Sequence, residues 1–96
     1  MYFALIYDVA DDYLERRTAF RPEHLALGQA AAARGELVLG GAFSEPADKS
    51  LLIFKGDDKS VAESFARNDP YVKNGLVKSW RIRPWNVVIG CAHSPS

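Results

Sequence analysis

Cysteine and histidine are scarce in this 96-residue sequence, which has only Cys91, His24 and His93. A single cysteine cannot form an internal disulfide, which suits a reducing compartment, so we expect a cytoplasmic protein. These three residues show no metal-ligand spacing, and we therefore expect no metal site. A glycine-rich phosphate loop is missing as well, because no predicted helix directly follows Gly40-Gly41, and we expect no cofactor.

An excess of charge of either sign is also missing, because twelve basic residues balance twelve acidic ones. Lys78, Arg81 and Arg83 alternate with aromatic residues, as on some nucleic-acid-binding surfaces, but the neutral balance predicts no nucleic-acid partner. No apolar run approaches the roughly 20 residues of a membrane span, so we expect no membrane partner. Residues 1–8 lack the basic start and small-residue cleavage site of a signal peptide.

Hydrophobic residues make up 48% of the sequence and charged residues 25%, a balance typical of a globular protein. We expect one domain over residues 1–90 and a flexible tail over residues 91–96. Hydrophobic periodicity and turn residues predict these elements in order: a strand at 2–9, a loop or irregular turn of helix at 11–20, a helix at 22–34, strands at 37–43 and 50–55 forming a hairpin, a helix at 59–68, a turn or single helical turn at 70–75 and a strand at 76–85. Residues 86–90 are expected to continue the last strand or to add an edge strand.

Several residues favour these helix boundaries. Pro22 suits the first position of a helix, where its missing N–H has no intrahelical partner, and Gly35 suits the position just after a helix end. Ser60 and Glu63 have the spacing of a capping box, and Pro70 disfavours helical backbone in the residue before it. The resulting order is β-α-β-β-α-β, which predicts an α+β, ferredoxin-like fold with an antiparallel sheet and both helices on one face.

Two helices can cover only one face of such a sheet, yet both faces are apolar. Alternate residues of the first strand point to opposite faces: Phe3, Leu5 and Tyr7 to one, Tyr2, Ala4 and Ile6 to the other. A bare face of several hundred Å² exceeds what soluble monomers usually leave exposed. We therefore predict a homodimer packed sheet to sheet, and the sequence leaves open whether dimers assemble further.

His24 is the best candidate in the sequence for chemistry. Leu27, Gly28 and Ala31 follow it by three, four and seven residues, so the imidazole lies on the inward apolar face of the helix. Near the predicted helix start, the helix dipole would favour the neutral ring. The alternative is that His24 is an ordinary hydrogen-bonded core residue.

Asp69 is the second candidate, at the C-terminal end of the second helix. A carboxylate is disfavoured there by a few tenths of a kcal/mol to about 1 kcal/mol, and broken local rules tend to mark functional sites. The alternative is that Asp69 caps the following turn. With both helices on one sheet face, the start of the first can approach the end of the second. A carboxylate paired to His24 would fix the tautomer of the ring and support a general base.

Three segments and the ending Arg83-Pro84-Trp85 together resemble the YciI-like (YCII-related) family. The segments are Arg21-Pro22-Glu23-His24-Leu25, Gly40-Gly41, and Asp69-Pro70-Tyr71 continuing to Leu76. The resemblance runs from about residue 2 to residue 88. It implies a ferredoxin-like fold in a dimeric α/β barrel, with an active site on a His-Asp pair that maps onto His24 and Asp69. The chemistry assigned in the family is elimination, such as loss of halide from a chlorinated hydroxylated aromatic.

Four further residues are candidate substrate contacts. Arg17 and Arg21 flank the predicted helix start and could bind an anionic group, or be solvated surface charges. Tyr71 could donate a proton or simply pack. Gly41, with its neighbour Gly40, permits close approach of a molecule from outside.

Two functions follow from these residues. The first is a small cytoplasmic enzyme of lyase or isomerase type, resembling a dehydrochlorinase, in which His24 removes a proton from a small aromatic or carbonyl substrate and Asp69 supports the imidazolium. The second is a non-catalytic ligand-binding or accessory dimer, because fold does not imply function.

Overall fold

The computed structural model describes residues 1–90 and contains one four-stranded sheet. Its elements, in order, are β1 (Tyr2–Val9), α1 (Tyr13–Ala33), β2 (Leu37–Ala42), β3 (Lys49–Lys55), α2 (Ser60–Asn68), α3 (Pro70–Lys73) and β4 (Val77–Trp85). The strands lie in the order β2-β3-β1-β4, and each neighbouring pair is antiparallel. The predicted ferredoxin-like arrangement, including the hairpin of β2 and β3, is confirmed.

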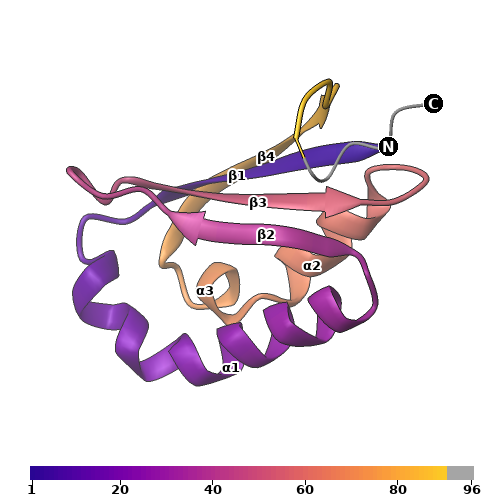
Figure 1. Ribbon diagram of the computed structural model, residues 1–96. Helices are drawn as coiled ribbons and strands as arrows, with labels where there is room; N and C mark the ends of the chain where they lie inside the picture. The colour runs from indigo at the N-terminus through magenta and orange to yellow at the C-terminus, as the bar shows by residue number, and fades with distance from the viewer. Residues whose placement is uncertain (91–96) are drawn as a thin grey trace.

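All three helices lie on one face of this sheet (Figure 1). The alternation in β1 decides which side chains meet them, because Phe3, Leu5, Tyr7 and Val9 are buried, whereas the residues between them are only partly buried. The core between the sheet and the helices is completed by apolar residues of β3, α2 and the segment before β4: Leu52, Phe54, Ala62, Phe65, Ala66 and Leu76.

The first helix begins nine residues earlier than the sequence predicts, at Tyr13 instead of Pro22. Residues 13–21 are mostly good helix formers, and buried Tyr13 anchors them through an edge contact with Tyr71. Pro22 therefore lies inside α1, where its missing N–H leaves a bend, and the first turns of α1 run at an angle to the rest (Figure 1). Within residues 1–90, neither α1 nor a shorter helix has the length and apolar character to cross a membrane.

Two glycines end helices by the same hydrogen-bond pattern. Gly35 and Gly75 have φ of 77° and 78°, a conformation that other residues adopt only with strain. After each glycine the next N–H reaches back five residues, from Glu36 to the carbonyl of Ala31 and from Leu76 to that of Tyr71. This is the Schellman arrangement. The end predicted at Gly35 is confirmed.

Two smaller predictions about chain ends and caps were wrong. The N-cap of α2 is Lys59, without a side-chain cap, and the Ser60 N–H instead donates a hydrogen bond to the Asp58 carboxylate, so the predicted capping box does not form. Residues 86–90 form no strand. The predicted flexible tail, residues 91–96, lies outside the described residues.

Candidate active site

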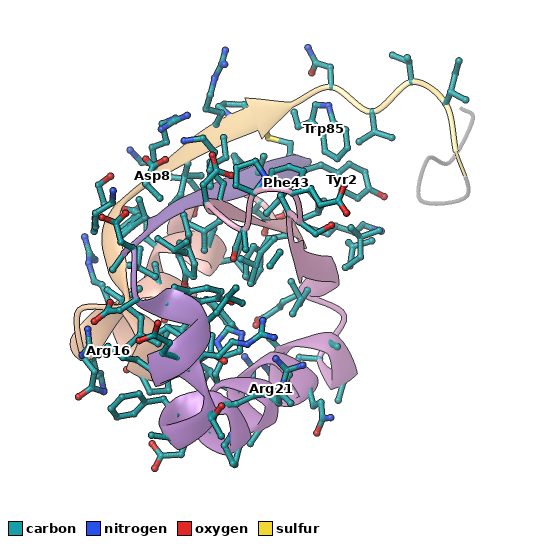
Figure 2. The ribbon with its side chains drawn as sticks, turned by 90° about the vertical axis from the view of Figure 1, so that its left-hand side faces the viewer. Tyr2, Asp8, Arg16, Arg21, Phe43 and Trp85 are labelled. Carbon is teal, nitrogen blue, oxygen red and sulfur yellow. The ribbon has the colours of Figure 1, made fainter. Side chains whose placement is uncertain are left out.

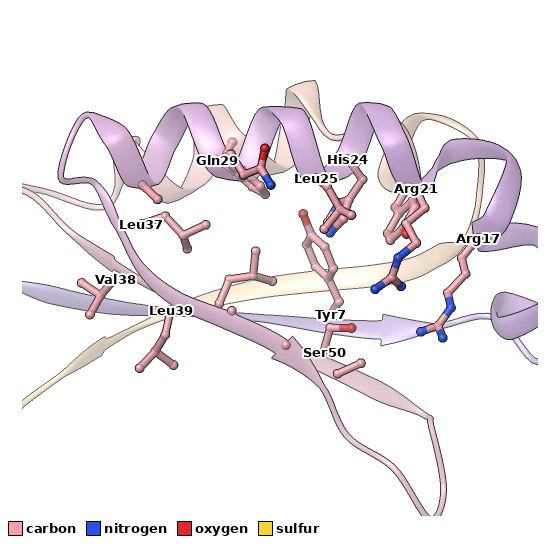
Figure 3. Close-up of a pocket in the computed structure, with 18 of the residues that line it drawn as sticks. Tyr7, Arg17, Arg21, His24, Leu25, Gln29, Leu37, Val38, Leu39 and Ser50 are labelled. Atoms are coloured by element: carbon pink, nitrogen blue, oxygen red, sulfur yellow. The ribbon is translucent and has the colours of Figure 1, made fainter.

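A pocket of about 500 Å³ lies between α1 and the half of the sheet that contains β2 (Figure 3). The whole of β2 forms one wall, and α1 contributes Arg17, Arg21 and His24 to the opposite wall. Much of the wall is apolar, with Leu37 and Leu52 from the sheet and Phe65 from α2. None of the described residues that line the pocket is acidic. A small, partly apolar molecule would fit such a cavity.

His24 and Asp69 meet at the inner end of this pocket. The Nδ1 atom of His24 lies 2.8 Å from Oδ1 of Asp69, although the two residues are 45 positions apart. Asp69 lies where the chain turns from α2 into α3, as the C-cap of one helix and the N-cap of the next. The side-by-side helices thus bring the two residues together, as their order in the sequence suggests.

The Asp69 side chain is fully buried and accepts three hydrogen bonds. Oδ1 accepts from His24 and, at 3.0 Å, from the backbone N–H of Tyr71, and Oδ2 accepts from the Tyr7 hydroxyl at 2.7 Å. Buried charge is tolerated only when it is paired and hydrogen-bonded in this way. Asp69 therefore caps α3 through the Tyr71 N–H, as the alternative reading of this residue predicted, and it also contacts His24. Its role in catalysis stays a prediction.

This contact fixes how the imidazole can be used. With a carboxylate at Nδ1, that nitrogen carries the proton, and Nε2 of the neutral ring is left as an acceptor. The ring is held flat against Tyr71, with ring centroids 3.9 Å apart and planes within 7°, and edge-on to Phe65. His24 lies in the middle of α1, three turns after its start, so the predicted influence of a helix N-terminus on the ring was wrong.

Tyr7 is a part of this site that the sequence analysis missed. Burial raises the pKa of its hydroxyl well above the usual value of 10.0, and the charge of Asp69 and their hydrogen bond raise it further. The hydroxyl therefore stays protonated and acts as a fixed donor to the carboxylate. The signal available in the sequence was its place on the inward face of β1, because a buried tyrosine hydroxyl usually has a partner.

The four other candidate residues all line the same pocket. Figure 3 shows Arg17 and Arg21 reaching from α1 toward the sheet, on the side of His24 that faces the start of the helix. The Tyr71 ring stacks on His24, and its buried hydroxyl has no hydrogen-bond partner in the described part of the chain. Gly41 lies in β2, and a Cβ added there would meet nothing within 4 Å, so this part of the wall is open. Whether these residues bind a substrate stays a prediction.

Residues 1–90 contain no group of three or more His, Cys, Asp or Glu side chains placed to hold a metal ion. His24 and Asp69 lie together, but their other neighbours are tyrosines and a phenylalanine, which do not complete a typical ligand set.

Comparison with solved structures gives two informative likenesses. The first is 5-chloro-2-hydroxyhydroquinone dehydrochlorinase from Burkholderia phenoliruptrix AC1100, in complex with 2,5-dihydroxybenzoquinone, with a TM-score of 0.75, 23% identity, and coverage of 90% of this chain and 94% of that chain. The second is a Deinococcus radiodurans protein proposed to be an antibiotic biosynthesis monooxygenase, with a TM-score of 0.55, 11% identity, and coverage of 99% and 100%. At these identities the likeness shows a shared fold.

Sequence comparison is more specific about the family. No curated protein sequence gives a significant match. The sequence model of the YCII-related domain, in contrast, matches residues 1–86, which include β1, both walls of the pocket, His24 and Asp69. The chain therefore belongs to the YCII-related domain family.

Proposed function

We propose that the protein is an enzyme of the lyase type that removes a proton from a small aromatic substrate, with His24 as the general base and Asp69 as the residue that orients it. The observation that carries this proposal is the 2.8 Å contact between His24 Nδ1 and the buried Asp69 carboxylate. It leaves Nε2 as the one ring nitrogen available to a molecule in the pocket, and it supports the positive charge that the ring gains.

The chemistry is an elimination that needs only these groups and water. Nε2 of His24 takes a proton from a carbon or hydroxyl of the substrate, and the electron pair left behind forms the new double bond. Chloride leaves with the electrons of its bond to carbon, and the imidazolium later gives its proton to water. The products are the unsaturated compound, one proton and one chloride ion. Negative charge that develops on the ring oxygens would be stabilised by a nearby donor such as Arg21.

The comparisons supply the reaction class for this proposal. One structural neighbour is a dehydrochlorinase that acts on a chlorinated hydroxylated aromatic. The structural likeness to it extends over nearly the whole length of both chains. The fold is common to many activities, so this analogy suggests the first substrate to try and does not by itself assign a function.

The test is chloride release from 5-chloro-2-hydroxyhydroquinone by wild type, His24→Gln, Asp69→Asn and the control Arg67→Gln. Arg67 is exposed on α2 and does not line the pocket. We expect His24→Gln to lose at least about 100-fold in kcat/KM, because general-base catalysis contributes that much, and Asp69→Asn to lose a comparable amount. Circular dichroism would check that each variant folds.

Folded variants that release chloride at the wild-type rate would refute the catalytic roles of His24 and Asp69. Substrate binding without turnover by any of the four proteins would instead favour the alternative function, a non-catalytic ligand-binding module. A cytoplasmic location stays a prediction that no observation on the described residues tests.

We also propose that two copies of the chain pair through the open sheet face. Cross-strand neighbours place Ile6 beside Leu51, and Leu39 beside Ile53, on the face away from the helices. Figure 2 shows Tyr2, Phe43 and Trp85 on that side, opposite to Arg21. An apolar face of this kind needs cover in water, and a second copy supplies a matching surface.

A further inference from the structure

Two arginines in the pocket have no acidic partner within the part of the chain that the structure describes. Arg17 lies with its guanidinium carbon 5.6 Å from the Tyr13 ring centroid, and neither Arg17 nor Arg21 forms an ion pair with another of residues 1–90. By contrast the neighbouring Arg16 of the same helix is paired with Asp12 and donates a hydrogen bond to the Asn74 carbonyl. The two arginines therefore add positive charge to a pocket whose described lining contains no carboxylate.

The hydroxyl of Tyr71, in the wall of the same pocket, has no hydrogen-bond partner among residues 1–90. Tyr71 is 2% exposed, and its hydroxyl oxygen is the one buried side-chain polar atom without a hydrogen-bond partner among residues 1–90. Buried polar groups nearly always have partners, so an orphaned one in a pocket wall is an unusual feature. Burial and the neighbouring Tyr13 raise the pKa of this hydroxyl, whereas the charges of Arg21 and Arg17 lower it. The guanidinium of Arg17 lies 5.6 Å from the centroid of the Tyr13 ring, and that ring contacts Tyr71 edge-on.

The spacing along α1 orders these donors relative to the base. Arg17, Arg21 and His24 are separated by four and three residues, so they follow one another on a single face of the helix. Figure 3 shows the two guanidinium groups and the His24 ring on the side of α1 that faces the sheet. A molecule that touches both arginines at one end can thus reach His24 with its other end.

We propose that Arg17, Arg21 and the Tyr71 hydroxyl form a subsite for a planar, delocalised oxyanion carried on a small aromatic ring. Such an anion is a carboxylate or the ionised oxygen of a hydroxyquinone. Arginine donors suit its flat geometry, and the hydroxyl of Tyr71 supplies a further donor. The aromatic ring lies against Leu37, Leu52 and Phe65, and Nε2 of His24 faces the bond to hydrogen that breaks. This inference rests on the proposed function for the role of His24, but the binding of the anion does not depend on catalysis.

The test is isothermal titration calorimetry of the whole protein at neutral pH with three probes. They are 4-hydroxybenzoate, 2,5-dihydroxybenzoquinone, which is ionised at that pH, and the neutral 4-hydroxybenzamide. Wild type should bind at least one of the two anions at least about tenfold more tightly than the amide, because a charged hydrogen bond contributes that much. The preferred anion then distinguishes a carboxylate substrate from a hydroxyquinone.

Variants assign this preference to the subsite. Arg21→Gln and Arg17→Gln should each raise the Kd of the preferred anion by about tenfold and leave the amide unchanged, whereas Arg67→Gln, with the same loss of charge on exposed α2, should have no effect. Equal binding of anions and amide by wild type, or unchanged anion binding by both pocket variants, would overturn the proposal.

Tyr71→Phe tests the orphaned hydroxyl separately. It should weaken anion binding while the thermal midpoint of the free protein stays the same or rises, because a buried group without a partner is lost. A lower midpoint with unchanged binding would show that the hydroxyl is structural. His24→Gln should keep the anion preference. The two proposals can therefore fail separately. A wild-type protein that binds the anion but releases no chloride would refute the proposed catalysis and leave the subsite standing.

Discussion

At the level of single residues, Asp69 depends on Tyr7 for one of its three hydrogen bonds. The Tyr7 hydroxyl donates to Oδ2 at 2.7 Å, and both side chains are almost completely buried. Tyr7→Phe keeps the ring and removes only this donor, which leaves an oxygen of a buried carboxylate without its partner. We expect the free energy of unfolding to fall by about 1–3 kcal/mol, as measured by urea denaturation.

The same substitution should lower kcat more than it raises KM, because Tyr7 acts through Asp69 on the orientation of His24. A double-mutant cycle with Asp69→Asn isolates this effect. Tyr7→Phe should lower the free energy of unfolding much less in the Asp69→Asn background than in wild type. If the two stability changes simply add, Tyr7 stabilises the core without holding the carboxylate.

The sequence predicted the two ends of the His24–Asp69 contact but not its surroundings. Helical spacing turned His24 inward, and the order of the elements brought Asp69 near it. The role of Tyr7 depends on the depth at which β1 passes beneath α3, which no local pattern encodes. The predicted influence of the helix dipole on the His24 ring was wrong for a related reason. Pro22 is compatible both with a helix start and with a bend inside a longer helix.

At the level of secondary structure, one carboxylate joins three strands. Asp8 in β1 binds Lys49 of β3 through Oδ1, and Ser79 and Arg81 of β4 through Oδ2. Hydrogen bonds from Lys49 and Ser79, and the charges of Lys49 and Arg81, hold the pKa of Asp8 below its usual value of 3.8. The folded protein therefore releases this proton more readily than the unfolded chain does.

Asp8 should therefore stabilise the folded protein at neutral pH more than at acidic pH. Where the unfolded state binds more protons, stability rises with pH, so the contribution of Asp8 is complete above 3.8. It is lost as the pH falls through 3.8 and on through the lower pKa of the folded state. We expect wild type to be more stable than Asp8→Asn at pH 7, with the difference shrinking at acidic pH in chemical denaturation. A difference that is constant from pH 7 to strongly acidic pH would contradict this role for Asp8.

The boundaries of the elements show which local signals suffice. Strands and the Gly35 helix end were predicted closely, because side-chain alternation and a positive φ are local properties. The start of α1 was not predicted, because the residues before Pro22 are held in the helix by a distant contact, the burial of Tyr13 against Tyr71. The absent capping box at Ser60 has a similar origin, since Asp58 lies closer to its N–H than Glu63 does in sequence and takes that bond.

For the molecule as a whole, the question is what covers the second face of the sheet. Except for Ile53, the buried residues of the sheet lie on the helix side, whereas Leu39, Phe43 and Trp85 are 60%, 51% and 48% exposed. On this face Asp8 forms ion pairs with both Lys49 and Arg81. Because β2 belongs to both this face and the pocket wall, pairing would also fix the strand that faces His24.

Leu39→Glu tests this pairing, with Leu14→Glu as its control. Leu39 lies on the open face, whereas Leu14 is similarly exposed, at 53%, but lies on α1. Sedimentation velocity at micromolar concentration should show dimers for wild type and Leu14→Glu and monomers for Leu39→Glu, because a charge buried without a partner in the interface is strongly unfavourable. A wild-type protein that sediments only as a monomer would rule out the dimer. In that case the apolar face would need a different partner, and the wall of the pocket formed by β2 would stay open to water during catalysis.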